Sequence, residues 1–147
     1  MEDNRSIVER YVAALPADLD TLTSLQHPDF VEEWPQSGER IVGSENFRAI
    51  QEHYPDVTGE VLRLVGTEDR WTVAPTFTPL RIVGAGDTFT ALARARYPDG
   101  SEYHVVSVLE VRDGRIARAT TFFAERFEPP DWRARWVERV PGPKGPD

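Results

Sequence analysis

Apolar residues recur every three or four positions in two stretches near the N-terminus, and this spacing predicts two amphipathic helices. The first covers residues 7–15, and Pro16 ends it because proline cannot continue a helix. The second is shorter and covers residues 19–25. Its side-chain cap is Asp18, and Pro28 is expected to end it.

The next part of the chain combines a short strand with a third helix. Residues 30–34 predict a short strand that Pro35 closes, and the polar residues 36–40 predict a turn. Ser44 is the expected cap of the third helix, and Pro55 is its expected end.

Beyond this helix the pattern changes to the period of two that is typical of strands. Turn signals rich in Gly, Pro and Asp divide it into segments at about residues 58–67, 70–74, 78–84, 87–97, 102–112 and 115–126. A final helix is expected to begin at Asp131 and to carry Trp132, Trp136 and Val140.

Helices segregated from a long antiparallel run of strands predict an α+β fold. A strongly bent sheet can wrap around the N-terminal helices as a cone and enclose one pocket. Residues 1–140 are expected to form this single domain, and the Pro- and Gly-rich residues 141–147 a disordered tail.

Composition narrows the classes of function. The net charge of −8 argues against nucleic acid and anionic membranes as partners. There is no Cys, which excludes thiolate chemistry and disulfides, and the only Lys, Lys144, lies in the expected tail. No stretch has the roughly 20 apolar residues of a membrane span, and no signal segment is evident, so a cytoplasmic location is expected.

Several stretches of the sequence resemble known families. Residues 8–15, 18–20 and 30–33 resemble the opening of the Δ5-3-ketosteroid isomerases, and residues 34–43 resemble the SnoaL-like polyketide cyclases. Both families belong to the nuclear-transport-factor-2-like superfamily, and the order of elements matches over about residues 4–126. The resemblance implies a cone-shaped fold, a hydrophobic small-molecule ligand and a homodimer.

It also implies roles for two residues. Tyr11 falls where the isomerases keep a phenol that donates to the developing oxyanion, and Glu33 falls where they keep an aspartate as general base. Strand alternation gives a different answer for the base, because Glu32 must point inward if Phe30 and Trp34 do. Tyr11 could equally be a core aromatic, and Glu33 an exposed acid on an edge strand.

The isomerases have a second oxyanion donor, a protonated Asp, whose equivalent here lies at or near Ser107. A hydroxyl donates more weakly than an acid, so this departure reduces the resemblance to a true steroid isomerase. His104 lies on the same expected strand and could act in acid–base chemistry near neutral pH, or be an ordinary sheet histidine.

Large aromatic residues can line a pocket or fill a core. The candidates for the pocket wall are Trp34, Tyr54, Trp71, Phe122 and Phe123. The three His residues share no metal-ligand spacing with one another or with a carboxylate pair, so neither a metal nor a cofactor is expected.

Three functions stay open at this point. The first is a cofactor-free enzyme that removes a proton beside a carbonyl and stabilises the enolate, as an isomerase or a cyclase would, with Glu33 as base, Tyr11 as donor, and Ser107 or His104 assisting. The second is a non-catalytic protein that binds a small apolar molecule. The third is an epoxide hydrolase of the limonene type.

Overall fold

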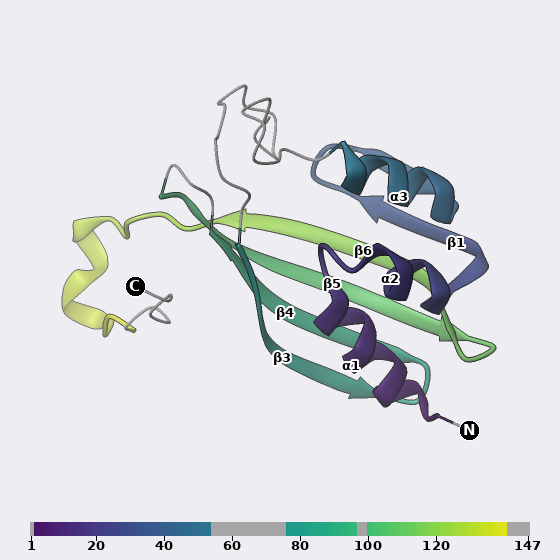
Figure 1. Cartoon of the computed structure of the whole chain (residues 1–147). Helices are drawn as coiled ribbons and strands as arrows, with labels where there is room; N and C mark the ends of the chain where they lie inside the picture. The colour runs from purple at the N-terminus through teal and green to yellow at the C-terminus, as the bar shows by residue number, and fades with distance from the viewer. Residues whose placement is uncertain (1, 54–75, 97–99, 141–147) are drawn as a thin grey trace.

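The computed structural model describes residues 2–53, 76–96 and 100–140. In this part of the chain, N-terminal helices lie against one face of a curved sheet, which confirms the α+β prediction (Figure 1). The elements in chain order are α1 (Asn4–Ala14), α2 (Leu19–Leu25), β1 (Gln26–Trp34), β2 (Glu39–Val42), α3 (Ser44–Glu52), β3 (Thr76–Ala85), β4 (Thr88–Arg96), β5 (Glu102–Arg112), β6 (Arg115–Glu125) and the short 3-10 helix η1 (Asp131–Trp136).

The six strands form one sheet in the order β2-β1-β6-β5-β4-β3. Neighbouring strands from β3 to β6 are antiparallel, as the turn signals predict. In contrast, β1 pairs with β6 in parallel, with Glu32 opposite Ala119 and Glu33 opposite Thr120. The first strand therefore joins the sheet through the last one, which the prediction of an all-antiparallel sheet did not include.

The first two helices form where the sequence predicts them. The side chain of Asp3 accepts a hydrogen bond of 2.8 Å from the backbone N–H of Ser6 and caps α1. Asp18 caps α2 in the same way, through the N–H of Thr21 at 3.3 Å. The expectation that Pro28 ends the second helix is wrong, because the chain leaves α2 at Leu25 and passes directly into β1, which contains Pro28.

Two further local predictions need correction. Ser44 is the first residue of α3 and not its cap, since Gly43 occupies the cap position without a side-chain hydrogen bond. The expected turn at residues 36–40 is shorter, because Glu39 and Arg40 already belong to β2. The β2 strand runs back along β1 and places Ile41 opposite Glu32.

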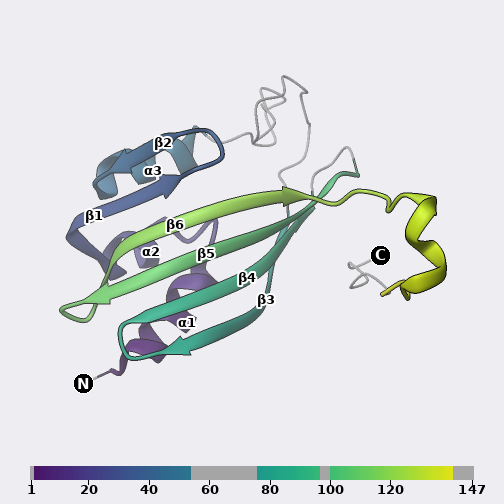
Figure 2. The same cartoon turned by 180° about the vertical axis from the view of Figure 1, so that it is seen from behind.

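The strands of the second half lie close to their predicted bounds, and β5 covers the predicted residues 102–112. The segments expected at 58–67 and 70–74, and the tail at 141–147, lie outside the described residues. The final helix is only the short η1, which ends at Trp136 and buries none of its side chains. In Figure 2 it lies beyond the end of β6, away from the helices.

The core lies between the helices and the face of the sheet that they cover (Figure 2). One side of α1 is fully buried there, and Phe30 of β1 packs edge-on against Phe47 of α3 with 5.7 Å between ring centres. The main buried apolar residues are Ile7, Val8, Tyr11, Val12, Leu22, Phe30, Phe47, Phe89, Leu109 and Ile116. We call this covered face of the sheet the inner face and the opposite one the outer face.

Within the described residues, no helix has both the length and the apolar character needed to cross a membrane.

Candidate active site on the inner face

A carboxylate is buried in the inner face. Glu32 lies on β1 opposite Ala119 of β6, and only 8% of its surface is exposed. Removal from water disfavours the charged form, so burial raises the pKa of Glu32 to about 7. The indole Nε1 of Trp34 donates a 2.6 Å hydrogen bond to Oε2 of Glu32, which stabilises the charged form and limits this rise. The result is an acid that can gain and lose a proton near neutral pH.

Tyr11 lies close enough to Glu32 for the carboxylate charge to affect its ionisation. It projects from α1 and is 1% exposed. Burial first and the Glu32 charge second raise the pKa of the Tyr11 phenol well above its ordinary value. The phenol therefore keeps its proton and can act as a hydrogen-bond donor but not as an acid.

A third polar side chain, Gln26, completes the group. Its Nε2 donates a 2.9 Å hydrogen bond to the Tyr11 hydroxyl oxygen, and the residue is 2% exposed. Sequence reasoning did not identify Gln26. The available signal was its position at an even spacing from Phe30 and Glu32, which places a polar residue in phase with the buried ones. We call Glu32, Tyr11 and Gln26 the inner polar cluster.

The structure decides between the two neighbouring glutamates. Glu33 points to the outer face, where its carboxylate forms ion pairs with Arg40, at 3.7 Å, and with Arg118. The structure therefore places the carboxylate of Glu33, the residue to which the family resemblance assigned the role of base, away from the inner face. The alternation argument, which points Glu32 inward with Phe30, gives the observed arrangement.

Ser107 lies on the inner face, but its hydroxyl already has a partner. It pairs with Thr121 of β6, and the two hydroxyl oxygens are 2.9 Å apart. Thr121 is two residues beyond Ala119, the residue opposite Glu32, so this hydroxyl pair lies on the same face as the inner polar cluster. It adds two neutral polar groups to that face.

His104 does not join the cluster. It lies on β5 opposite Arg94 of β4 and Ala124 of β6, and its side chain is exposed on the outer face. The prediction that His104 assists catalysis is not supported by this position. Arg96, two residues beyond Arg94 on β4, forms a 2.7 Å ion pair with Glu102.

The aromatic candidates divide between the two faces. Trp34 and Phe123 meet edge-on on the inner face, with ring centres 5.9 Å apart, whereas Phe122 is 40% exposed on the outer face and is not part of the site. Tyr54 and Trp71 lie outside the described residues.

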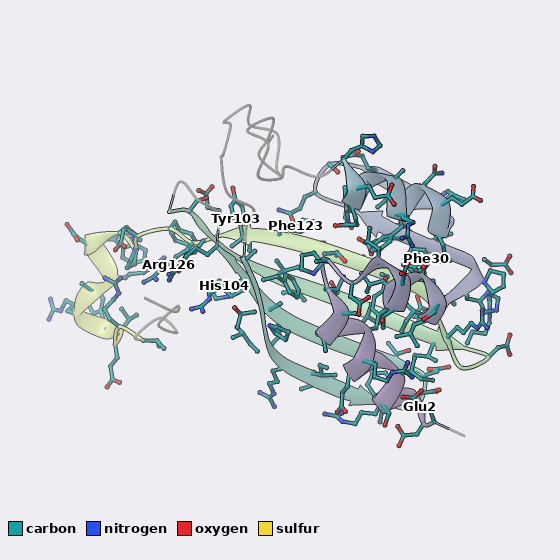
Figure 3. All side chains as sticks on the ribbon, in the orientation of Figure 1. Glu2, Phe30, Tyr103, His104, Phe123 and Arg126 are labelled. Atoms are coloured by element: carbon teal, nitrogen blue, oxygen red, sulfur yellow. The ribbon has the colours of Figure 1, made fainter. Side chains whose placement is uncertain are left out.

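Phe123 also contacts a second apolar group, in which Tyr103 is the largest buried residue (Figure 3). Figure 3 shows both rings toward the end of the sheet from which the C-terminal segment leaves, and Phe30 toward the other end. The polar cluster thus has apolar and aromatic surroundings.

The outer face has an open hollow of about 320 Å³, lined by Asp29, Val31, Asp87, Glu110, Val111, Arg112, Ala117 and Arg118. Its charged side chains are exposed to solvent, whereas Glu32 and Gln26 are buried on the inner face, so we place the site there. Among the described residues, no group of three or more His, Asp or Glu side chains could hold a metal ion.

Comparison with known proteins agrees with this fold. A structure of an NTF2-like protein of unknown function from Burkholderia xenovorans is similar, with 29% identity, a TM-score of 0.73, and coverage of 93% of this chain and 94% of that one. A protein from Kribbella flavida, whose name calls it a candidate ketosteroid isomerase, has 26% identity, a TM-score of 0.74, and coverage of 95% and 90%.

More distant structures share the fold alone. One is a limonene-epoxide-hydrolase-like epoxide hydrolase from Mycobacterium tuberculosis, with 21% identity, a TM-score of 0.58 and coverage of 80% of each chain. No curated protein matches the sequence. The family model of the SnoaL-like domain matches residues 8–119, most of the chain. The protein is therefore a member of the SnoaL-like domain family, within the NTF2-like superfamily.

Proposed function

We propose that the protein is a cofactor-independent enzyme that removes a proton from the carbon beside a carbonyl group of a hydrophobic small molecule. The observation that carries this proposal is the buried carboxylate of Glu32, whose pKa of about 7 suits a general base, next to a phenol that keeps its proton. Glu32 takes the role that the sequence resemblance gave to Glu33.

The reaction begins with Glu32 ionised and a C–H bond of the substrate within its reach. The carboxylate takes the proton, the C–H electron pair forms the carbon–carbon double bond of an enolate, and the negative charge moves to the carbonyl oxygen. Tyr11 donates a hydrogen bond to that oxygen, and its retained proton stabilises the charge without being transferred.

Two outcomes are open to the enolate. Protonated Glu32 can return the proton to a different carbon, which isomerises the substrate. Alternatively, the enolate carbon can attack a second carbonyl of the same molecule, which closes a ring, and the new alkoxide then takes the proton back from Glu32. Both sequences restore the Glu32 carboxylate and consume no cofactor.

Three findings support the proposal. The aromatic surroundings of Trp34, Phe123 and Tyr103 suit an apolar ligand. The protein from Kribbella flavida that is named as a candidate ketosteroid isomerase shares 26% of its sequence with this chain. Enolisation is also the step that isomerases and aldol-type cyclases have in common.

A non-catalytic binding protein is the second candidate. Ser107 stands near the position where the isomerases place a second acid, and its hydroxyl is hydrogen-bonded to Thr121, so the inner face has only neutral hydroxyls there. Such a site would bind a carbonyl compound without turning it over.

The test is proton exchange in D2O, followed by NMR on a panel of cyclic β,γ-enones, β-diketones and 1-tetralone. Wild type is compared with Glu32→Gln, and Glu33→Gln is the matched control because it removes the neighbouring carboxylate on the opposite face. We expect a loss of at least about 100-fold in exchange rate for Glu32→Gln and a near-normal rate for Glu33→Gln.

Exchange that depends on Glu33 and not on Glu32 would refute the assignment of the base. Thermal stabilisation by the panel without any exchange would favour the binding protein.

A further inference from the structure

The inner polar cluster contains one hydrogen-bonding atom that the proposed reaction does not use. Gln26 Nε2 donates to Tyr11, but the other end of the same amide, Oε1, is buried and has no hydrogen-bond partner in the described part of the chain. A buried polar atom without a partner destabilises the folded state, so its presence in a folded interior calls for an explanation.

The Tyr11 hydroxyl has the opposite unused capacity. Its oxygen accepts from Gln26, and within the described residues its proton has no acceptor. A phenol hydroxyl is both donor and acceptor, so this proton can be donated to a ligand that reaches it. The two groups are hydrogen-bonded to each other at 2.9 Å, so the free donor and the free acceptor lie side by side.

The protein offers a donor, the Tyr11 hydroxyl, next to an acceptor, Gln26 Oε1. A complementary ligand therefore has an acceptor next to a donor. From this pairing we propose that the substrate carries a hydroxyl or N–H group on the carbon next to its carbonyl, with the carbonyl oxygen on Tyr11 and the hydroxyl or N–H on Gln26 Oε1. The natural class is a hydrophobic α-hydroxy ketone or its nitrogen analogue. The inference deepens the proposed function and rests on it for the position of the carbonyl.

This assigns Gln26 two tasks. Its amide N–H fixes the Tyr11 oxygen, which directs the phenol proton toward the ligand, and its amide oxygen selects for a donor on the ligand. A ligand that lacks the donor leaves the buried acceptor of the site unpaired. The site therefore discriminates strongly against such a ligand. Gln26 is therefore a specificity residue, whereas Glu32 and Tyr11 serve the reaction.

The test compares two probes of similar size, 2-hydroxy-1-tetralone and 2-methyl-1-tetralone, by isothermal titration calorimetry. At about pH 5.5 Glu32 is mostly protonated, so binding is measured without proton abstraction. We expect wild type to bind the hydroxy compound about tenfold more tightly than the methyl compound. The hydroxy compound forms a hydrogen bond to Gln26 Oε1, whereas the methyl compound leaves this buried acceptor unpaired.

In Gln26→Met, which keeps the length of the side chain but has neither amide group, the preference should fall to within about twofold. Leu25→Met is the matched control, because it changes the neighbouring buried residue without altering the polar cluster, and it should keep the preference. Circular dichroism of both variants checks that they fold.

Equal binding of the two probes by wild type would overturn the inference even if Gln26→Met did not fold. A preference that persists in folded Gln26→Met would overturn it as well. These binding measurements do not depend on catalysis. If binding shows a preference that requires Gln26 but no proton exchange is detected, the proposed enzymatic activity is refuted and the proposed class of ligand is retained.

Discussion

The indole Nε1–H of Trp34 donates a hydrogen bond of 2.6 Å to Oε2 of Glu32, two residues earlier on the same strand. This contact works against the main influence on the carboxylate, since burial raises the pKa of Glu32 and the indole donor lowers it. Trp34 thus limits how far the pKa of Glu32 lies above its ordinary value, in addition to its edge-on packing against Phe123.

Replacing Trp34 with Phe should shift the pH dependence of the reaction. Without the indole donor the ionised form of Glu32 loses a stabilising contact, so its pKa rises above the wild-type value of about 7. A base is active only when ionised, and the rise of kcat/KM with pH should therefore move to higher pH in Trp34→Phe. An unchanged or lower midpoint would contradict this account.

The stability of the protein should also depend on Glu32. Its folded pKa of about 7 lies above the ordinary value of 4.5, so the folded state binds the proton more tightly than the unfolded state does. The free energy of unfolding should therefore fall as pH rises from about 4.5 to about 7, by on the order of 3 kcal/mol from this group alone.

Glu32→Gln removes this titration while keeping the shape of the side chain. We expect the variant and wild type to have similar unfolding free energies near pH 4.5, and the variant to be the more stable one near pH 8, as measured by urea denaturation. Glu33→Gln should not show this pattern. A difference between Glu32→Gln and wild type that does not change with pH would refute the raised pKa.

Tyr11→Phe tests the oxyanion donor. The loss of one such donor typically reduces the rate by about 100- to 1,000-fold, so kcat for proton exchange should fall by that amount. The variant also leaves Gln26 Nε2 without its acceptor, which should lower stability by roughly 1–3 kcal/mol. Rates are therefore compared at a temperature where both proteins are folded, and a variant with wild-type kcat would exclude the role.

Phe122 offers a test of the homodimer that the sequence resemblance implies. It is 40% exposed on the outer face, in register with Val106 of β5, and this face carries no helix in the described part of the chain. We expect Phe122→Glu to convert a dimer into a monomer in light scattering. Leu80→Glu, a charge at an exposed apolar position of the edge strand β3, is the control and should leave the dimer intact.

Local patterns predicted the elements well, because each of those signals is contained in a few neighbouring residues. The cap of α2 and the bounds of β5 are examples. The parallel pairing of β1 with β6 was not predicted, because it joins segments far apart in the chain and leaves no local signal.

The site was only partly predictable for a related reason. Transferring the base from the family pattern gave Glu33, whereas the physical rule of strand alternation gave Glu32, the residue that the structure buries. Gln26 was missed because its importance comes from a contact with Tyr11 on a different element, and no spacing in the sequence encodes that contact.

The pairing of β1 with β6 also bears on how the protein is made. On the ribosome, β1 emerges early, but Ala119, the residue opposite Glu32, is among the last parts of the sheet to be synthesised. Closing so long a loop is entropically costly and slow, so β1 is expected to dock late in folding. Until then Glu32 is expected to be solvated, and the burial that raises its pKa is established only when the sheet is complete.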